Sequence, residues 1–239
     1  MPTHRRTAIV AGALYLLTFV TSIPAVALKA PALDAAFVLG DASSPLPVWG
    51  ALSEILLAAA CIGTAVALYP VVRRRNEGLA LGFVAARTME AALIAVGVLT
   101  ILSIITLRDV SGLDDDALTS VHAALVAVHD WTFLVGPGII PAISGLCLGS
   151  ILYATGLVPR IIPAMGLIGA PLLLASATAT IFGLSDQISW LAAAAALPIA
   201  AWEGSLGVWL VVKGFRPDAL ARLGLAGELP VEAPEPVAA

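Results

Sequence analysis

The chain has 239 residues, of which 60% are hydrophobic and only 12% are charged, and its mean hydropathy is +1.01. A soluble globular protein averages about 25% charged residues, so this chain lacks the charged surface that would keep a large core in solution. The net charge of −4 and the lack of a basic patch give no indication of a nucleic-acid partner. The composition instead predicts an integral membrane protein, with the lipid bilayer as its main partner.

Six apolar runs follow one another along the chain. A membrane-spanning helix needs about 20 consecutive, mainly apolar residues. The predicted spans cover residues 8–28, 47–72, 79–107, 131–153, 161–182 and 188–212. Turn-forming segments rich in glycine, proline or charge separate them, among them residues 40–45, 73–78 and 111–114. We therefore predict an all-α, polytopic transmembrane helix bundle that forms a single domain over residues 1–215.

The first run resembles a secretory signal peptide, because Arg5 and Arg6 precede it and the small residues 24–27 end it. Its apolar part is about 20 residues long, whereas the core of a signal peptide has about 7–15. We expect an uncleaved first helix, and removal of this segment stays open as the alternative.

An amphipathic stretch, residues 114–130, precedes the fourth run. Asp114, Asp115 and Asp116 stand at its start, where negative charges stabilise the N-terminus of a helix. Two interpretations stay open. The stretch either extends the fourth span outwards or lies in the membrane interface.

The C-terminal segment changes character after the sixth run. Residues 216–239 are more polar, and from Glu228 onwards they are rich in proline, glutamate and alanine. Such a composition buries too little apolar surface to fold, so we expect a disordered cytoplasmic tail.

Basic residues are concentrated on one side of the predicted topology. With the N-terminus inside, the cytoplasmic segments contain Arg5, Arg6, Arg73, Arg74, Arg75, Arg160, Lys213, Arg216 and Arg222. The outer segments contain only Lys29 and Arg108, together with Asp34, Asp41, Asp109, Asp114, Asp115, Asp116 and Asp186. The positive-inside rule therefore predicts that both termini are cytoplasmic. Trp49, Trp131 and Trp190 then fall at the outer boundary, where indole rings are enriched.

Ionisable residues inside the spans are the strongest indication of a functional site. Arg87 and Glu90 stand three residues apart on one face of the third span. From the helical rise, they lie about 12 and 16 Å from its inner end, and Glu203 lies about 14 Å from the inner end of the sixth span. A charge at this depth costs about 2.5–3.5 kcal/mol and needs a partner. We predict that the three residues form one cluster near the midplane.

This cluster admits two interpretations. One guanidinium cannot neutralise two carboxylates in a dry interior, so one glutamate is expected to be protonated at neutral pH. In the first interpretation, that carboxyl exchanges a proton or binds a polar ligand in a small-molecule or proton-coupled transporter. In the second, the cluster only joins the third and sixth helices of a structural or regulatory protein that acts through partners. A water-reachable cavity beside the cluster would favour the first, and dry packing the second.

A second polar group is expected near the outer edge. Glu54 lies about 10 Å below the outer surface and is a possible partner for His129. His122 and His129 share a helical face, and Asp130 adjoins them. With Glu54 as a further ligand, these residues allow a third interpretation, an intramembrane metal-dependent hydrolase. The sequence has no HExxH, GxSxG or phosphate-binding Gly-Lys-Ser/Thr motif, so we assign no catalytic residue, metal or cofactor.

Segments spread over most of the chain carry a family resemblance. They are residues 6–17, 68–70, 76–82, 133–138, 157–160, 166–171 and 213–215, together with Arg87, Glu90, Glu203 and Trp209. In combination they resemble the bacterial integral-membrane family called domain of unknown function 4386. The resemblance implies a bundle of about six helices in a bacterial cytoplasmic membrane, without an assigned activity. It implies no substrate and no oligomeric state.

Overall fold

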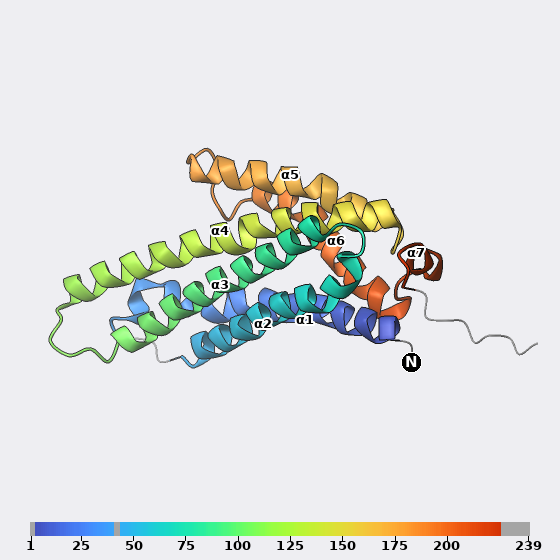
Figure 1. The fold of residues 1–239 in the computed structure, drawn as a ribbon. Helices are drawn as coiled ribbons and strands as arrows, with labels where there is room; N and C mark the ends of the chain where they lie inside the picture. Colours follow the sequence, from blue (N-terminus) through green and yellow to red (C-terminus); the bar gives the residue numbers. More distant parts are fainter. Residues whose placement is uncertain (1–2, 41–43, 226–239) are drawn as a thin grey trace, which may run out of the picture.

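The structure, a computed structural model, describes residues 3–40 and 44–225, and every regular element within these ranges is helical (Figure 1). The six long helices are α1 (Thr3–Lys29), α2 (Leu46–Val72), α3 (Glu77–Leu107), α4 (Asp115–Thr155), α5 (Ile161–Ile181) and α6 (Trp190–Val212). Each is long and apolar enough to cross a membrane. The predicted all-α bundle with six candidate spans is confirmed.

Polar caps and glycines set where several of these helices begin and end. The side chains of Asn76 and Ser189 accept hydrogen bonds from backbone N–H groups in the first turns of α3 and α6. Gly156 ends α4 with a φ of +66°, a left-handed conformation that favours glycine. Short elements complete the fold: the 3₁₀ helices η1 (Ala30–Leu33) and η2 (Ala35–Phe37), and α7 (Pro217–Arg222).

The six long helices form a closed ring. Each packs against the next in the chain, and α6 packs against α1. Contacts across the ring, such as those between α4 and α6, are far fewer. The middle of the ring is therefore a place where side chains from all six helices can meet.

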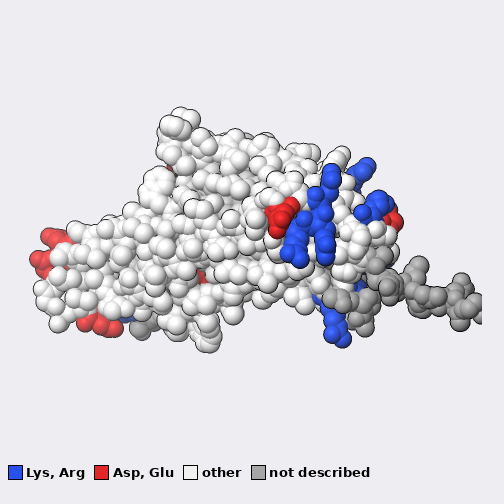
Figure 2. Space-filling view, in the orientation of Figure 1, with Lys and Arg blue, Asp and Glu red and all other residues white. Residues whose placement is uncertain are grey.

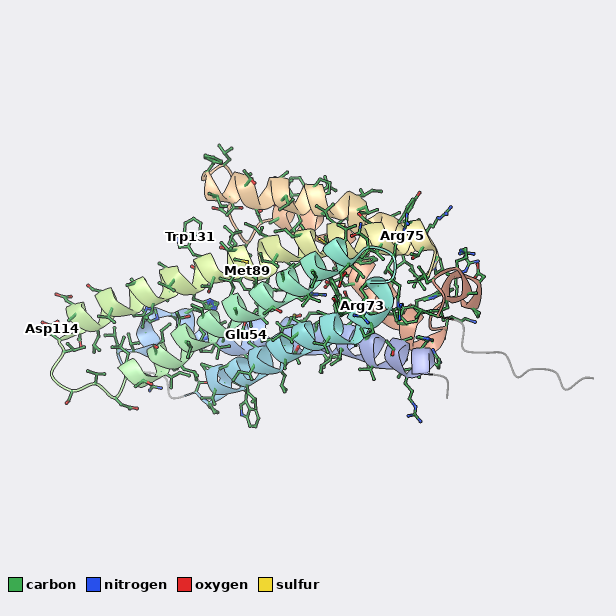
Figure 3. The ribbon with its side chains drawn as sticks, viewed as in Figure 1. Glu54, Arg73, Arg75, Met89, Asp114 and Trp131 are labelled. Atoms are coloured by element: carbon green, nitrogen blue, oxygen red, sulfur yellow. The ribbon has the colours of Figure 1, made fainter. Side chains whose placement is uncertain are left out.

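Charged side chains distinguish the two ends of the bundle (Figure 2). The end that we call the basic end carries Arg5, Arg73, Arg74, Arg75, Arg160, Arg216 and Arg222. The acidic end carries Asp34, Asp109, Asp114, Asp115, Asp116 and Asp186. Figure 3 shows Arg73 and Arg75 near one end and Asp114 at the other. Which end faces the cytoplasm stays a prediction.

Helix α4 decides between the two interpretations of residues 114–130. It runs without interruption over 41 residues, about 60 Å, and Asp114 caps its start by accepting a hydrogen bond from the N–H of Ala117. The stretch is an extension of the fourth span. Since α5 and α6 have only 21 and 23 residues, the α3–α4 hairpin projects beyond them at the acidic end (Figure 1).

The tail was predicted to be disordered from residue 216 onwards, but its first part is folded. Residues 217–222 form α7, and Ala219 is fully buried against the helices at the basic end. The N–H of Arg216 donates to the carbonyl of Leu157 at 2.9 Å, and the guanidinium of Arg222 donates to that of Thr155 at 3.2 Å. These contacts hold α7 on the α4–α5 turn. The rest of the predicted tail, residues 226–239, lies outside the described residues.

Buried apolar residues form two cores. The basic-end core joins all six long helices and α7, and includes Tyr15, Leu68, Phe83, Leu148, Ala170, Leu206 and Ala219. The acidic-end core packs α2 and α3 against the 3₁₀ helices and includes Phe37, Leu57, Ile94 and Ile101. The outer surface is also apolar, with exposed Val20, Val66, Leu99, Ile168 and Leu197. An apolar exterior of this kind suits contact with lipid tails.

Candidate functional site

Arg87 lies at the centre of the ring and joins two helices. Its Nη1 donates to Glu90 Oε2 at 2.9 Å, and its Nη2 donates to Glu203 Oε1 at 2.5 Å. Glu90 stands one turn further along α3, whereas Glu203 comes from α6. The structure thus brings together the three residues that the sequence placed at a common depth. Their functional role is a separate question.

The rest of the Arg87 side chain is enclosed. Arg87 is 1% exposed, and its guanidinium carbon lies 5.0 Å from the centre of the Tyr15 ring on α1. Its Nη1 also lies 3.9 Å from the sulfur of Cys61 on α2, and its Nε has no hydrogen-bond partner among the described residues. With both carboxylates ionised, this buried site carries one positive and two negative charges.

A cavity of about 200 Å³ lies beside this cluster, and we call it the central cavity. Its walls come from all six long helices. Arg87, Glu90 and Glu203 line it together with Thr18, Ser22, Leu57, Cys61, Pro137, Leu173 and Ile199. The volume is well above the roughly 10–15 Å³ that a single water molecule needs. The cluster therefore has open space beside it, whereas tight packing on all sides was expected of a purely structural clamp.

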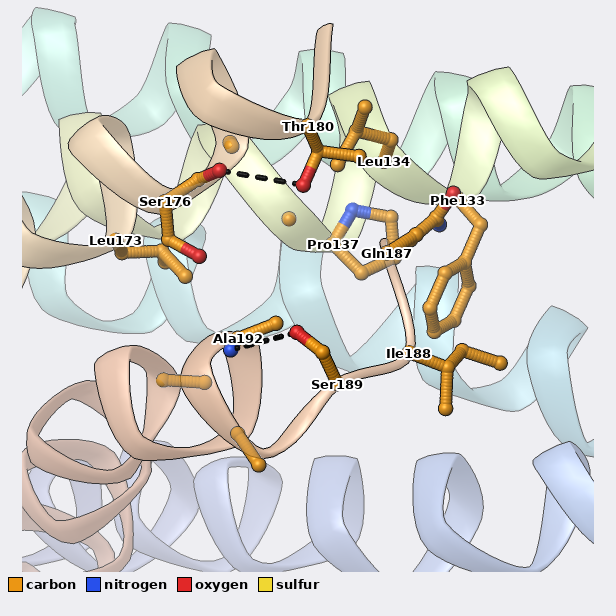
Figure 4. Close-up of a pocket in the computed structure, with 14 residues that line it drawn as sticks. Phe133, Leu134, Pro137, Leu173, Ser176, Thr180, Gln187, Ile188, Ser189 and Ala192 are labelled. Carbon is orange, nitrogen blue, oxygen red and sulfur yellow. Dashed lines mark hydrogen bonds between the residues drawn. The ribbon is translucent and has the colours of Figure 1, made fainter. Parts of the chain in front are cut away.

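A second cavity adjoins the central cavity on the side of the acidic end, and a third cavity adjoins the second. The larger, about 310 Å³, lies between α4, α5 and α6 and has mainly apolar walls (Figure 4). It shares Pro137, Leu173 and Ala196 with the central cavity. The other, about 160 Å³, lies between α1, α4 and the α5–α6 loop and shares Gln187 and Ile188 with the larger one. Together the three form a row from the cluster towards the acidic end.

Glu54 pairs with Lys29, so the pairing with His129 that the sequence left open is not formed. The Nζ of Lys29 donates to Glu54 Oε1 and lies 4.9 Å from the centre of the Phe133 ring. Both charges are buried, at 3% and 7% exposure, and Figure 3 shows Glu54 among the helices. At Gly50 a Cβ would lie 3.0 Å from the backbone nitrogen of Lys29, so glycine allows this close approach of α1 and α2.

Lys29 is the residue that the sequence analysis missed. The first apolar run ends at residue 28, so Lys29 was counted among the charges of the outer loop. The helix continues through Lys29 and carries its amine into the bundle. The sequence did indicate such a partner, because Glu54 lies about one-third of the way along an apolar span and a charge there requires a positive partner.

The histidines of α4 have different surroundings. His122 Nε2 lies 2.9 Å from the carbonyl oxygen of Ala32 in η1. His129 is 3% exposed, and neither of its ring nitrogens has a hydrogen-bond partner among the described residues. Asp130, the next residue, is exposed.

These residues do not form the metal site that the third interpretation requires. Glu54 is engaged by Lys29, and His122 by η1. Within residues 3–40 and 44–225, no three His, Cys, Asp or Glu side chains are grouped closely enough to hold a metal ion. The geometry therefore gives the hydrolase interpretation no support.

Comparison with known proteins identifies a family. The family model described as "Domain of unknown function (DUF4386)" matches residues 10–214. No curated protein matches the chain, and no solved structure does. The matched region includes all six long helices in whole or in large part, and with them the Arg87, Glu90 and Glu203 cluster. Because the match covers well over half of the sequence, the chain belongs to the family described as Domain of unknown function (DUF4386).

Proposed function

We propose that this protein binds a small organic cation, such as a protonated aliphatic amine, in the central cavity and carries it across the membrane. One observation carries the proposal: Glu90 and Glu203 share a single guanidinium beside a cavity of about 200 Å³. A cation is the ligand that this charge balance favours, because it neutralises the surplus carboxylate. An anion would add a third negative charge.

Charge balance also supports coupling to protons. An unneutralised carboxylate inside a protein is unfavourable, so the surplus carboxyl holds either a proton or the ligand cation. Binding of an ammonium group then releases one proton, and the total charge in the cavity stays the same. When this exchange takes place on each side of the membrane in turn, the amine is carried in one direction and a proton in the other.

The walls of the central cavity suit a short amphiphilic ligand. Thr18 and Ser22 line one part of it, and Leu57, Ile94 and Ile199 line another. An ammonium group can donate to the carboxylates and hydroxyls while an alkyl chain contacts the apolar wall. The volume limits such a chain to a few carbon atoms.

We propose further that the basic end faces the cytoplasm of a bacterial membrane, in line with the positive-inside rule. The row of cavities then leads from the cluster to the outer surface. Below the cluster, Tyr15, Leu68, Leu148, Leu206 and Leu210 are buried in the basic-end core. This arrangement corresponds to an outward-facing state, and release to the cytoplasm requires that core to separate.

A second function is supported by a different observation. Arg87 of α3 donates a charged hydrogen bond to Glu203 of α6, as a structural clamp would. In that case the protein acts through partners, and the central cavity binds nothing. The two functions predict opposite results in a binding experiment.

The test is isothermal titration calorimetry of the purified protein in detergent. The ligands are methyl- to butylammonium ions, with acetate to butyrate as probes of opposite charge. We expect binding of the ammonium ions only, with proton release seen as a dependence of the heat on the buffer. Glu203→Gln should abolish binding, and Asp116→Asn, which removes an exposed carboxylate outside the cavities, should not. Absence of ammonium binding, or binding unchanged by Glu203→Gln, would favour the clamp.

A further inference from the structure

The outer cavity, of about 160 Å³, contains a buried histidine without a partner. His129 forms part of its wall, together with Val26, Lys29, Asp130, Phe133 and Gln187. Both ring nitrogens of His129 lack hydrogen bonds within the described part of the chain, although the residue is 3% exposed. A buried polar group without a partner is unfavourable, and native proteins keep few of them. Such a group at the wall of a cavity indicates a place where a ligand binds.

The charges around His129 favour a cation. Lys29 on α1 and Glu54 on α2 face the ring and neutralise each other as an ion pair. Asp130 on α4 forms no ion pair with any described residue, so its carboxylate is the uncompensated charge of this cavity. The amide nitrogen of Gln187 donates to the backbone carbonyl of Asp130, not to its side chain. The carboxylate therefore has no side-chain donor from the α5–α6 loop.

The acidic end of the bundle, towards which this cavity lies, has the same sign. The acidic end carries Asp34, Asp109, Asp114, Asp115, Asp116 and Asp186. Against them stands Arg108, whose guanidinium carbon lies 4.5 Å from the centre of the Phe37 ring. A surface of one sign concentrates ions of the opposite sign near it and speeds their association.

We propose that the outer cavity is a second binding site, through which the cationic ligand passes on its way to the central cavity. The carboxylate of Asp130 accepts a hydrogen bond from its ammonium group, and an unprotonated ring nitrogen of His129 accepts another once the ring turns towards the cavity. The ligand then moves along the shared walls, past Gln187 and Ile188 into the larger cavity and past Pro137 into the central one. The nature of the ligand rests on the proposed function, whereas the route rests on the cavities and on His129.

Cysteine modification tests the route. Ser22 lines the central cavity and is replaced by cysteine in a background with Cys61→Ser and Cys147→Ser. The reagents are 2-aminoethyl methanethiosulfonate, a cation, and 2-sulfonatoethyl methanethiosulfonate, an anion, and mass spectrometry follows the mixed disulfide. We expect the cation to react about tenfold faster or more. His129→Phe, which keeps a ring but no nitrogen, and Asp130→Asn should each remove most of this preference. Asp116→Asn removes one of several carboxylates at the acidic end, about 20 Å along α4 from Asp130, and should reduce it only slightly.

Each outcome decides one question. A cation preference that is unchanged in His129→Phe and Asp130→Asn, or no preference at all, would overturn the route. Asp130 is exposed, so its variant stays informative if His129→Phe does not fold. Calorimetric binding of butylammonium separates the two proposals. If butylammonium binds but His129→Phe and Asp130→Asn do not change the rate of cysteine modification, only the proposed outer site is wrong. If the variants slow modification but butylammonium does not bind, the outer site stands and the proposed function fails.

Discussion

The bundle contains two buried charge sites, and they differ in charge balance and in space. Lys29 and Glu54 form a pair of one positive and one negative charge; the cavity that both of them line has only about 10 Å³, and Lys29 alone also borders the outer cavity. Arg87, Glu90 and Glu203 combine one positive with two negative charges, beside a cavity of about 200 Å³. The first site is complete within the protein. The second has both a charge to neutralise and room for the group that neutralises it.

The comparison shows how a structural ion pair differs from a binding site in the same environment. Removing one member of a balanced buried pair leaves an uncompensated charge, which is strongly destabilising. Removing the surplus member of an unbalanced site relieves repulsion and leaves the other pair intact. The two sites therefore predict different responses to the same substitution of glutamate by glutamine: a clear loss of stability at the first site and little change at the second.

The largest effect is expected for Arg87→Met, which leaves Glu90 and Glu203 without a positive partner. Because both carboxylates are buried, the free energy of unfolding should fall by about 3–5 kcal/mol. Thermal unfolding of the purified protein in detergent measures this loss. Adding Glu203→Gln to Arg87→Met should restore part of it. A variant as stable as the wild type would show that the cluster is not the charged site described above.

A somewhat smaller loss is expected for Glu54→Gln, which leaves the amine of Lys29 buried without a carboxylate. Lys29 stands at the end of α1, so its long side chain can turn towards the acidic end and recover some hydration. We expect a loss of about 2–3 kcal/mol, at or below the low end for a broken buried pair. The double variant Lys29→Met, Glu54→Gln should return to within about 1 kcal/mol of the wild type. A double variant as unstable as the single one would contradict a balanced pair.

A third prediction concerns the packing that positions Glu203. A Cβ on Gly166 of α5 would lie 2.8 Å from the Trp202 ring, which immediately precedes Glu203. Gly166→Ala should therefore displace α6 and cost about 1–3 kcal/mol. The matched control is Gly204→Ala on α6, where the nearest atom, in Phe19, would lie 3.6 Å away. Equal stabilities of the two variants in chemical unfolding would show that Trp202 does not fix the position of α6.

Much of the fold was predictable because it depends on patterns that can be seen along the sequence alone. Apolar runs of sufficient length located all six helices, and the helical rise placed Arg87, Glu90 and Glu203 at one depth. Their pairing followed because a bilayer leaves a buried charge no other partner. The length of α4 stayed open, since a few polar residues on an amphipathic helix fit an extension and an interfacial segment equally well.

The parts that could not be predicted depend on how helices approach one another. The Lys29–Glu54 pair requires α1 and α2 to come close at Gly50, which no local pattern reveals. The central cavity results from the closure of the ring between α6 and α1. The burial of Ala219 similarly depends on the α4–α5 turn, so α7 was assigned to a disordered tail.

The smallest change in stability, and the most direct test of the central claim, is expected for Glu203→Gln. The measurement is thermal unfolding of wild type and Glu203→Gln, each with and without butylammonium. Glutamine keeps an oxygen that can accept from Arg87, and Glu90 still neutralises the guanidinium, so the two proteins should differ by less than about 1 kcal/mol without the amine. With the amine, only the wild type should become more stable. A Glu203→Gln protein that is several kcal/mol less stable, with neither protein responding to butylammonium, would contradict a ligand site and identify the cluster as a clamp.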